Sequence, residues 1–308
     1  MKHLTVCFVL ITLTFSIALT LLSAEKTLSA EKTASILPVV GANHLMEAGV
    51  FPNADPETIK QYMPEGGAPA SMSSISLVMP GEYAVLFDTG LGDEAWLKSL
   101  NGIFDTGKIK ASDVKLVLQT HLHGDHIGGL LDGDNRRFPN AKILCAVPEY
   151  EYWLPKNESG VESPRNAQLE KIKTAYGQDF ATFNFGDIVF ECTEAKIKVH
   201  AWDAAGHTPG HTVFLIEHTA SAGNEEKHLI LGDLLHALAL QFPAPDVCAR
   251  FDMDIPKAID SRKRILDTAV QQQLRVWGMH FPIRDNGLVN GIVEKNPKGG
   301  YVLRQTGE

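Results

Sequence analysis

The sequence has 308 residues, of which 44% are hydrophobic and 21% are charged, and its formal net charge at pH 7 is -9. This composition is typical of a globular enzyme, and the length allows one large domain or two small ones. The acidic balance argues against a nucleic-acid partner, because the phosphates would be repelled.

The N-terminus has the pattern of a secretory signal peptide. A short positive start leads into an apolar run over residues 4–22, and the small residues Ser23 and Ala24 follow. An uncleaved membrane anchor is the alternative, since about twenty apolar residues can span a bilayer. Cleavage is favoured because small residues follow the run and no basic stop-transfer cluster does. We therefore expect a signal peptide over residues 1–24, a linker over 25–35, and a periplasmic or secreted protein with no membrane contact after cleavage.

Three cysteines remain once the signal is removed: Cys145, Cys192 and Cys248. Their number is odd and their spacings are wide, so they do not form a disulfide framework, although one bridge is open in an oxidising compartment.

Strands and helices alternate along the rest of the chain without an obvious linker. Residues 41–70 are irregular and rich in Gly, Pro and Asn, and they predict a long loop near the mouth of an active site. The expected strands are residues 36–40, 74–79, 83–87, 114–118, 142–146, 188–191, 197–200, 213–216, 228–231, 275–278 and 301–304. The expected helices are residues 93–100 with Asp93 as cap, 148–153, 163–176 and 255–272. This order predicts a single α/β domain over residues 36–308, built as one four-layered unit.

The motif that organises the chain follows the strand at residues 114–118. His121, His123, Asp125 and His126 occur within six positions, with Gly124 between them. Ligands at a strand-to-helix turn can converge because the backbone changes direction there. Four such side chains would cost heavily if they were buried without partners. Imidazole and carboxylate are ligands of borderline divalent metals, so the motif predicts two adjacent metal sites.

Three further candidate ligands each follow an expected strand: His207, Asp233 and His280. Taken singly they are weak, since Asp233 could be a helix N-cap. Together with the first motif they predict a complete ligand set. We expect His211 to support its turn, and Asp88 to be an outer carboxylate that orients a ligand histidine.

These residues resemble the ligand motif of the metallo-β-lactamase superfamily. The H-x-H-x-D-H pattern corresponds to His121, His123, Asp125 and His126, and the later ligands correspond to the three histidine and aspartate candidates above. The resemblance implies an αβ/βα sandwich with a dinuclear site along one edge. It also implies that His121, His123 and His207 hold one metal, that Asp125, His126 and His280 hold the other, and that Asp233 bridges them.

The C-terminal third resembles the methyl parathion hydrolase-like and lactonase subgroup more closely. The similar stretches are residues 232–242 and 251–254, the helix with Arg262 and Lys263, and the segment after His280. Members of that subgroup often continue with a Gly-rich segment, whereas this chain has Ile283-Arg284-Asp285-Asn286-Gly287. The wall of the pocket, and hence the substrate, is where the chain departs from the pattern.

The expected cofactors are two divalent cations, with zinc favoured by the histidine-rich ligands, although manganese, cobalt or iron are alternatives. Two close cations ionise a shared water near neutral pH, and the hydroxide attacks the substrate. Asp125 is the candidate catalytic residue, since it can bind a metal and also shuttle a proton.

We interpret Phe51, Tyr152, Trp153 and Phe281 as candidates for an aromatic pocket wall, with the core as the alternative location for most of them. An apolar mouth suits small neutral or hydrophobic esters and lactones. The sequence therefore favours a secreted lactonase or esterase with promiscuous phosphotriesterase activity. The alternatives are a phosphotriesterase as the main activity, a β-lactamase, a thioesterase, or a non-enzymatic metal-binding protein. The oligomeric state is open, with a homodimer among the options.

Overall fold

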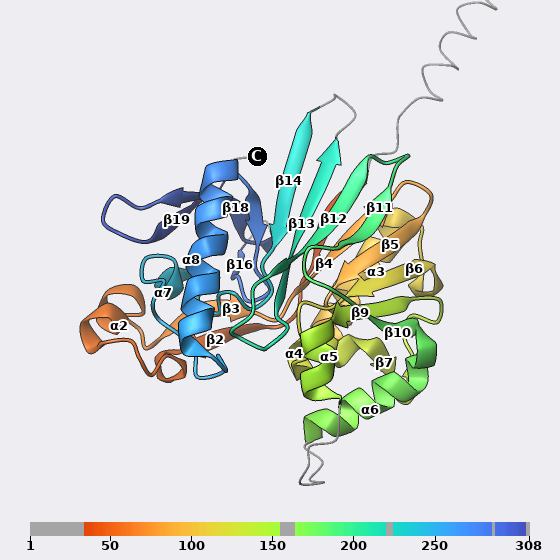
Figure 1. The fold of residues 1–308 in the computed structure, drawn as a ribbon, viewed down its shortest axis with the longest axis horizontal. Helices are drawn as coiled ribbons and strands as arrows, with labels where there is room; N and C mark the ends of the chain where they lie inside the picture. Colours follow the sequence, from red (N-terminus) through yellow and green to blue (C-terminus); the bar gives the residue numbers. More distant parts are fainter. Residues whose placement is uncertain (1–33, 155–163, 220–223, 285–286, 306–308) are drawn as a thin grey trace, which may run out of the picture. The chain divides into compact units, whose positions relative to one another are not determined.

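The structure is a computed structural model that describes residues 34–154, 164–219, 224–284 and 287–305. The expected signal peptide and most of the linker lie outside the described residues. Ala34–Glu308 form one compact unit. In it two β-sheets pack face to face with helices on their outer sides (Figure 1), which confirms the predicted four-layered α/β sandwich.

The first sheet has six strands in the order β1-β4-β5-β6-β9-β10. The β4–β5 hairpin is antiparallel, and β5, β6, β9 and β10 run parallel to one another. Parallel strands place their carboxyl ends at one edge of a sheet, and here that edge carries the ligand loop after β6. The strand bounds are β1 (Ser35–Val39), β4 (Ser74–Met79), β5 (Tyr83–Phe87), β6 (Val114–Leu118), β9 (Lys142–Ala146) and β10 (Phe180–Phe183).

The second sheet has seven strands in the order β11-β12-β13-β14-β15-β18-β19. It is antiparallel except where β14 pairs with β15. The loops after β12, β14 and β15 carry the remaining candidate ligands. The strand bounds are β11 (Ile188–Cys192), β12 (Ile197–Asp203), β13 (Thr212–Thr219), β14 (Glu225–Ile230), β15 (Arg275–Trp277), β18 (Asn290–Lys295) and β19 (Tyr301–Arg304).

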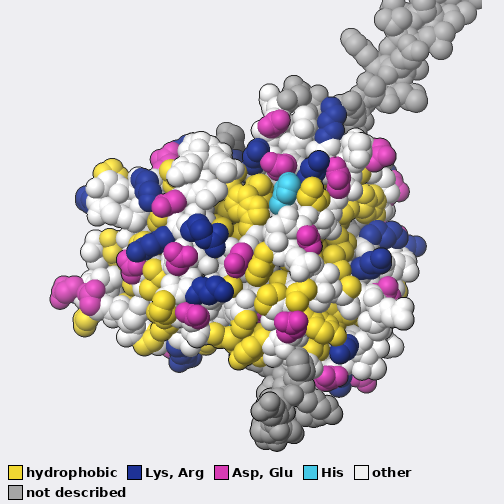
Figure 2. Space-filling model, in the orientation of Figure 1, with side chains coloured by type: hydrophobic (Ala, Val, Ile, Leu, Met, Phe, Trp, Pro, Cys, Tyr) yellow, Lys and Arg dark blue, Asp and Glu magenta, His cyan; other side chains and the backbone are white. Residues whose placement is uncertain are grey.

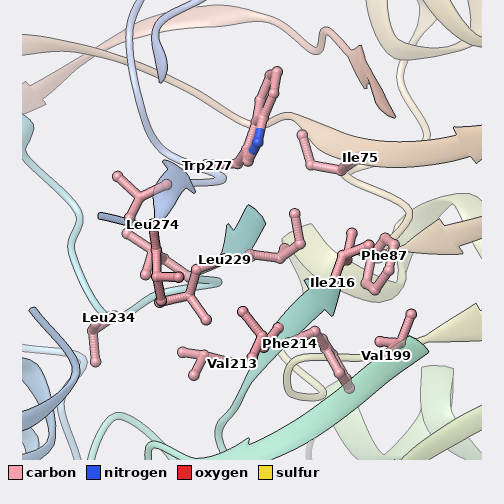
Figure 3. Packing of buried hydrophobic residues seen from close by; sticks show 14 of the residues in the cluster. Ile75, Phe87, Val199, Val213, Phe214, Ile216, Leu229, Leu234, Leu274 and Trp277 are labelled. Atoms are coloured by element: carbon pink, nitrogen blue, oxygen red, sulfur yellow. The ribbon is translucent and has the colours of Figure 1, made fainter. Parts of the chain in front are cut away.

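The central strands of the first sheet, β4, β5 and β6, are mostly buried on both faces, which explains their largely apolar sequences. In β5, Val85 and Phe87 face the cluster between the sheets, whereas Leu86 faces the cluster under the outer helices. The rings of Phe87 and Phe214 meet between the sheets with centroids 5.5 Å apart. Figure 3 shows these two rings among the aliphatic side chains that fill this layer. The layer fixes the sheets against each other and thereby aligns the edges that carry the loops.

The helices lie outside the sheets. Figure 1 shows α8 beside the seven-stranded sheet and α3, α5 and α6 beside the six-stranded one. Asp93 accepts the amide hydrogen of Trp96 at 2.8 Å, which confirms it as the cap of α3, although that helix continues beyond Leu100. The helix bounds are α2 (Pro56–Tyr62), α3 (Glu94–Gly107), α4 (Gly124–Ile127), α5 (Val147–Trp153), α6 (Pro164–Tyr176), α7 (Leu238–Gln241) and α8 (Ile255–Gln272), and the 3₁₀ turns are η1 (Ala48–Val50), η2 (Ala111–Asp113), η3 (Gly128–Leu130) and η4 (Gly177–Asp179).

The prediction of a long loop over residues 41–70 is wrong. This segment forms the hairpin of β2 (Asn43–Glu47) and β3 (Gly67–Ser71), with η1 and α2 between the two strands. Its glycines and Pro69 hid the second strand, because these residues are uncommon in strands. Two further hairpins pair β7 (Leu131–Asp132) with β8 (Asn135–Arg136) and β16 (Ile283–Arg284) with β17 (Gly287–Leu288).

The described surface is mixed in charge. Figure 2 shows Lys and Arg interspersed with Asp and Glu on the visible face, with hydrophobic side chains exposed between them. Every helix in the described ranges is too short or too polar to cross a bilayer. Cys145, Cys192 and Cys248 are free thiols, so the one disulfide that the sequence left open does not form among them.

Candidate metal centre

The first four candidate ligands follow β6: His121 and His123 lie on the loop before the short helix α4, and Asp125 and His126 lie within that helix. His121 and His126 are almost completely buried, at 0% and 1% exposed, and His123 is 6% exposed. His123 occupies the position just before α4, and Asp125 lies in its first turn. The reversal of the backbone here separates the four side chains into two groups, as the sequence predicts.

Three imidazole nitrogens form a first cluster. The Nε2 atom of His207 lies 3.2 Å from Nε2 of His121 and 3.0 Å from Nδ1 of His123. Nitrogens bound to one tetrahedral zinc at 2.0–2.1 Å are about 3.3 Å from each other, so this spacing suits a shared cation. The loop after β12 thus brings His207 to the pair that follows β6.

A second cluster joins Asp125, His126 and His280. The Nε2 atoms of His126 and His280 lie 3.0 Å and 3.1 Å from Oδ1 of Asp233. Nε2 of His280 is also 3.5 Å from Oδ2 of Asp125. The other oxygen of Asp233, Oδ2, lies 3.4 Å from Nε2 of His207 in the first cluster. One carboxylate therefore faces both groups, as a bridging ligand requires.

The donor atoms of the second cluster fit a cation. Nε2 of His126 and Oδ1 of Asp233 are buried, and among the described residues neither has a hydrogen-bond partner, although they lie 3.0 Å apart. Buried polar atoms in native proteins are almost always satisfied, and an ion is one way to satisfy them. Two groups of four possible ligands share Asp233, one of His121, His123, His207 and Asp233 and the other of Asp125, His126, Asp233 and His280. His207, His236 and Asp252 form a third, smaller group beside them. Imidazole nitrogens and carboxylate oxygens of this kind suit zinc and its neighbours in the first transition series.

Asp88 and His211 hold this ligand set in place, as the sequence predicts. Oδ2 of Asp88 accepts a hydrogen bond from Nδ1 of His126 at 2.7 Å, and both its oxygens accept from Thr120, next to His121. Burial raises the pKa of Asp88, and the charge of His126 and these hydrogen bonds oppose that rise. The ring of His126 is thereby fixed with Nε2 toward the cluster.

His211 supports Asp233, the aspartate that faces both clusters. Burial lowers the pKa of His211 to about 3, so the ring is neutral near pH 7. Its Nε2 accepts the backbone N–H of Asp233 at 3.0 Å, and its Nδ1 faces the carbonyl oxygen of Ala204 at 3.1 Å. Gly232 precedes the aspartate with φ of +54°, and a Cβ there would lie 2.7 Å from the His211 ring. Glycine is therefore required where the chain turns the aspartate into the centre.

The two clusters open into a cavity of about 400 Å³. Strand β2, the turn η1 and the segment before α8 form its walls, and the exposed residues Arg250 and Phe251 lie at its mouth. The lining residues are His44, Leu45, Met46, Glu47, Val50, Met72, His123, Asp125, His207, Asp233, His236, Arg250, Phe251 and His280. The predicted position of the hairpin segment near the mouth is thus correct, although its conformation is not a loop.

None of the four residues predicted for an aromatic wall lines the cavity. Phe51 and Phe281 are 2% and 0% exposed and pack in hydrophobic clusters, because large apolar rings gain most from full burial. Tyr152 is 54% exposed and lies outside the lining. Trp153 is buried behind the lining, with its ring 5.5 Å from that of His123. Phe251 is the aromatic residue that lines the cavity.

Sequence reasoning missed three buried polar residues around the centre: Glu149, His236 and Asp252. Asp252 accepts from Nδ1 of His207 at 2.9 Å, and Nε2 of His236 lies 3.2 Å from Oδ2 of Asp233. His236 is the third residue after the bridging aspartate, a spacing that could have indicated a residue facing the same centre. Asp252 and Glu149 are distant in sequence from the ligands they support, so no local pattern reveals them.

Comparison with known proteins agrees with this geometry. The chain is 38% identical over 190 residues to the "Lactamase-like protein nscB" of Neosartorya fischeri, an alignment that covers 59% of this chain and 44% of that protein. The chain spans less than half the length of the curated relatives it matches.

Two solved structures share the fold. The "hydrolase AbOPH in beta lactamase superfamily" has a TM-score of 0.72 and 22% identity, and the alignment covers 90% of this chain and 96% of that one. "AidC, a Dizinc Quorum-Quenching Lactonase" has a TM-score of 0.71 and 24% identity, with 89% and 95% covered. At these identities the two structures show that the fold is shared. The family model of the metallo-beta-lactamase superfamily matches residues 68–268, and the chain therefore belongs to the metallo-beta-lactamase superfamily.

Proposed function

We propose that the protein is a secreted dinuclear zinc hydrolase that cleaves lactones or carboxylic esters, with phosphotriesterase activity as a side reaction. The observation that carries this proposal is the pair of ligand clusters that share Asp233 at the floor of the cavity. The histidine-rich ligand set supports zinc over harder cations. The similar fold of a protein described as a dizinc lactonase supports the same reaction class.

The residues divide the work as follows. His121, His123 and His207 would hold the first cation, and Asp125, His126 and His280 would hold the second, with Asp233 between them. When bound, such cations polarise the substrate and lower the pKa of water toward neutrality. The chain orients these imidazoles through the ring nitrogen that faces away from the cluster. Nδ1 of His126, His207 and His280 contacts Asp88, Asp252 and the carbonyl oxygen of Ser71, respectively.

Asp125 is the proposed proton carrier. Its side chain is 25% exposed, far more than the other ligands, and it lines the cavity. A carboxylate at the boundary between the ligand cluster and the cavity can accept a proton from the attacking water and pass it to the leaving group. This position suits a reaction whose nucleophile is water rather than a side chain.

The cavity supports a small neutral or hydrophobic substrate. The apolar part of the lining comprises Leu45, Met46, Val50 and Phe251, and Leu45 is 54% exposed. An acyl or aryl group can remove this apolar surface from water while its ester group reaches the centre. Arg250, which the sequence did not single out, adds one positive charge at the mouth and suits the carboxylate formed when a lactone opens.

The test combines metal analysis with a substrate panel. Purified protein should contain two metal ions per chain and should cleave acyl-homoserine lactones or aryl esters faster than paraoxon-type triesters. A β-lactam chromogen is the control for the superfamily's namesake activity, and we expect no turnover because Asp233 supplies a bridging carboxylate. Metal-replete protein that cleaves no lactone, ester or triester would overturn the proposal. Detection of the precursor and the shortened mature chain in cell fractions tests secretion.

A further inference from the structure

Glu149 is a buried carboxylate that connects two ligand loops. It lies in the first turn of α5 and is 0% exposed. Oε1 accepts from the backbone N–H of Leu122 at 2.9 Å and from Nε1 of Trp153 at 2.6 Å. Oε2 accepts from the hydroxyl of Thr208 at 2.7 Å and from the backbone N–H of Gly210 at 2.9 Å. Its four described partners are all donors, as an ionised carboxylate requires.

The two loops held by Glu149 carry the whole imidazole set of the first cluster. Leu122 lies between His121 and His123, and Thr208 directly follows His207. The closest pair of ligands across these segments, His123 and His207, is 84 residues apart in sequence, so the segments need a tertiary contact to hold their spacing. Glu149 accepts one hydrogen bond from the backbone of each segment and one from the hydroxyl of Thr208, next to His207.

The contact requires a close approach of the backbone. A Cβ added at Gly210 would lie 2.3 Å from the backbone nitrogen of Glu149 and 2.6 Å from its Cα. Glycine at this position therefore allows the second loop to reach α5. The second cluster is held differently, because His126 bonds to Asp88 and Nδ1 of His280 lies 2.8 Å from the carbonyl oxygen of Ser71.

We propose that Glu149 is a positioning residue for the first metal site, and that its loss weakens that site selectively. This inference rests on the proposed dinuclear function. Neither oxygen of Glu149 contacts a ligand atom, so its effect passes through the backbone that sets the spacing of the three imidazoles. Supporting partners of this kind typically contribute about 10–100-fold to metal affinity.

The substitution Glu149→Gln isolates this role. The amide keeps the size of the side chain, but one carboxylate oxygen becomes an NH₂ group. That group cannot accept the two hydrogen bonds that the oxygen accepted. The hydroxyl of Thr208 can rotate to accept from the amide nitrogen, whereas the N–H of Gly210 cannot. We therefore expect the amide nitrogen to face Thr208 and the loop that carries His207 to lose a hydrogen bond. The matched control is Glu151→Gln, which makes the same change at an exposed position of α5.

Metal occupancy is the readout. Zinc is titrated into metal-free protein against a competing chelator, and the two sites are distinguished by ¹¹³Cd NMR, since three imidazoles shift the resonance differently from a carboxylate-rich set. We expect E149Q to lose about 10–100-fold affinity at the imidazole site and less than about 3-fold at the other. E151Q should match the wild type at both sites.

Equal weakening at both sites, or wild-type affinity at both in folded E149Q, would overturn the inference. Circular dichroism of the variant establishes whether it folds. If it does not fold, Thr208→Val replaces it, because this change removes one donor and keeps the carboxylate. T208V should weaken the imidazole site alone, and weakening at both sites or at neither would equally overturn the inference. Wild-type protein that binds fewer than two cations would instead contradict the proposed function.

Discussion

Oδ1 of Asp252 lies 2.9 Å from Nδ1 of His207 and turns the opposite ring nitrogen toward the first cluster. Its other oxygen accepts from the backbone N–H of Ala249 at 3.1 Å and from the buried guanidinium of Arg262 at 3.3 Å. Burial opposes the charge of Asp252, but the hydrogen bond from His207 and the nearby positive groups hold its pKa below the usual range. Arg262 on α8 thus holds Asp252, and Asp252 in turn orients the ring of His207 on a different loop.

The first prediction concerns this contact. Asp252→Asn should lower zinc affinity and kcat/KM together by about 10–100-fold, because the amide cannot both accept from His207 and pair with Arg262. Asp260→Asn, an exposed change on α8, is the control and should have no effect. Chelator competition and ester hydrolysis measure the two quantities, and an unchanged metal affinity would contradict the role assigned to Asp252.

The second prediction concerns the shared carboxylate. Asp233→Ala should reduce lactone, ester and triester hydrolysis in parallel by more than about 100-fold, because a ligand is worth more than the partners that orient it. Initial rates on the three substrate classes provide the measurement. Loss of one activity with retention of another would mean that a second site performs part of the chemistry.

The third prediction concerns metal removal. Dialysis against a chelator should abolish hydrolysis and lower the melting temperature, and added zinc should restore both. A ligand present at 100 times its dissociation constant stabilises the folded state by about 2.7 kcal/mol. Calorimetry and activity assays on the same samples test this, and full activity in metal-free protein would exclude the proposed mechanism.

The fourth prediction concerns acid stability. His211 has a folded pKa of about 3 because it is buried, whereas the unfolded pKa is about 6.5. Between these values the unfolded chain binds a proton that the folded protein does not, so this group lowers stability as the pH falls below about 6.5. The slope is about 1.4 kcal/mol per pH unit.

His211→Gln removes that proton. The variant should be less stable than the wild type at pH 7, because the hydrogen bond to Asp233 is disturbed. The difference should narrow by about 1.4 kcal/mol for each unit of acidification below pH 6. Denaturant unfolding of both proteins at matched metal content supplies the values, and parallel curves from pH 7 to pH 4 would refute the prediction.

The fifth prediction concerns the apolar wall. Phe251 lines the cavity and is 38% exposed, so it can bury more surface when an acyl chain binds. Phe251→Ala should raise KM for long-chain esters by about 5–10-fold, which corresponds to roughly 1 kcal/mol of apolar contact, and should leave acetyl esters nearly unchanged. Ile188→Ala, at an exposed apolar position on β11, is the control. Equal effects on long and short esters would place the acyl group elsewhere.

The sequence indicates which side chains cluster because each candidate ligand follows a strand, and strand ends converge along one edge of a sandwich. His121, His123, Asp125 and His126 also identify themselves by their density in one loop. The supporting residues did not emerge, since Glu149 lies 27 residues from Leu122 and 61 from Gly210, and only the folded chain makes them neighbours.

Pocket residues were the weakest part of the prediction. Phe51 and Phe281 are residue types that often line a pocket. A sequence does not distinguish an aromatic ring in the core from one that lines a cavity, and both of these rings lie in the core. The segment that supplies the observed cavity wall has a sequence typical of a loop. The second strand of its hairpin, Gly67–Ser71, is made of small residues and a proline. Its pairing with β2 is a tertiary property that a local pattern does not carry.

The ligands come from both halves of the sandwich: four follow a strand of the six-stranded sheet, and His207, Asp233 and His280 follow strands of the other. Cations at this edge would connect the two halves, because each cation would be bound by residues of both. Neither half holds the full ligand set for either ion, so a complete site forms only after the two halves have assembled. A cell that makes this protein in a metal-poor compartment would accumulate chains whose two halves are packed together along the apolar layer. In these chains no cation would connect the halves at the edge that carries the ligand clusters.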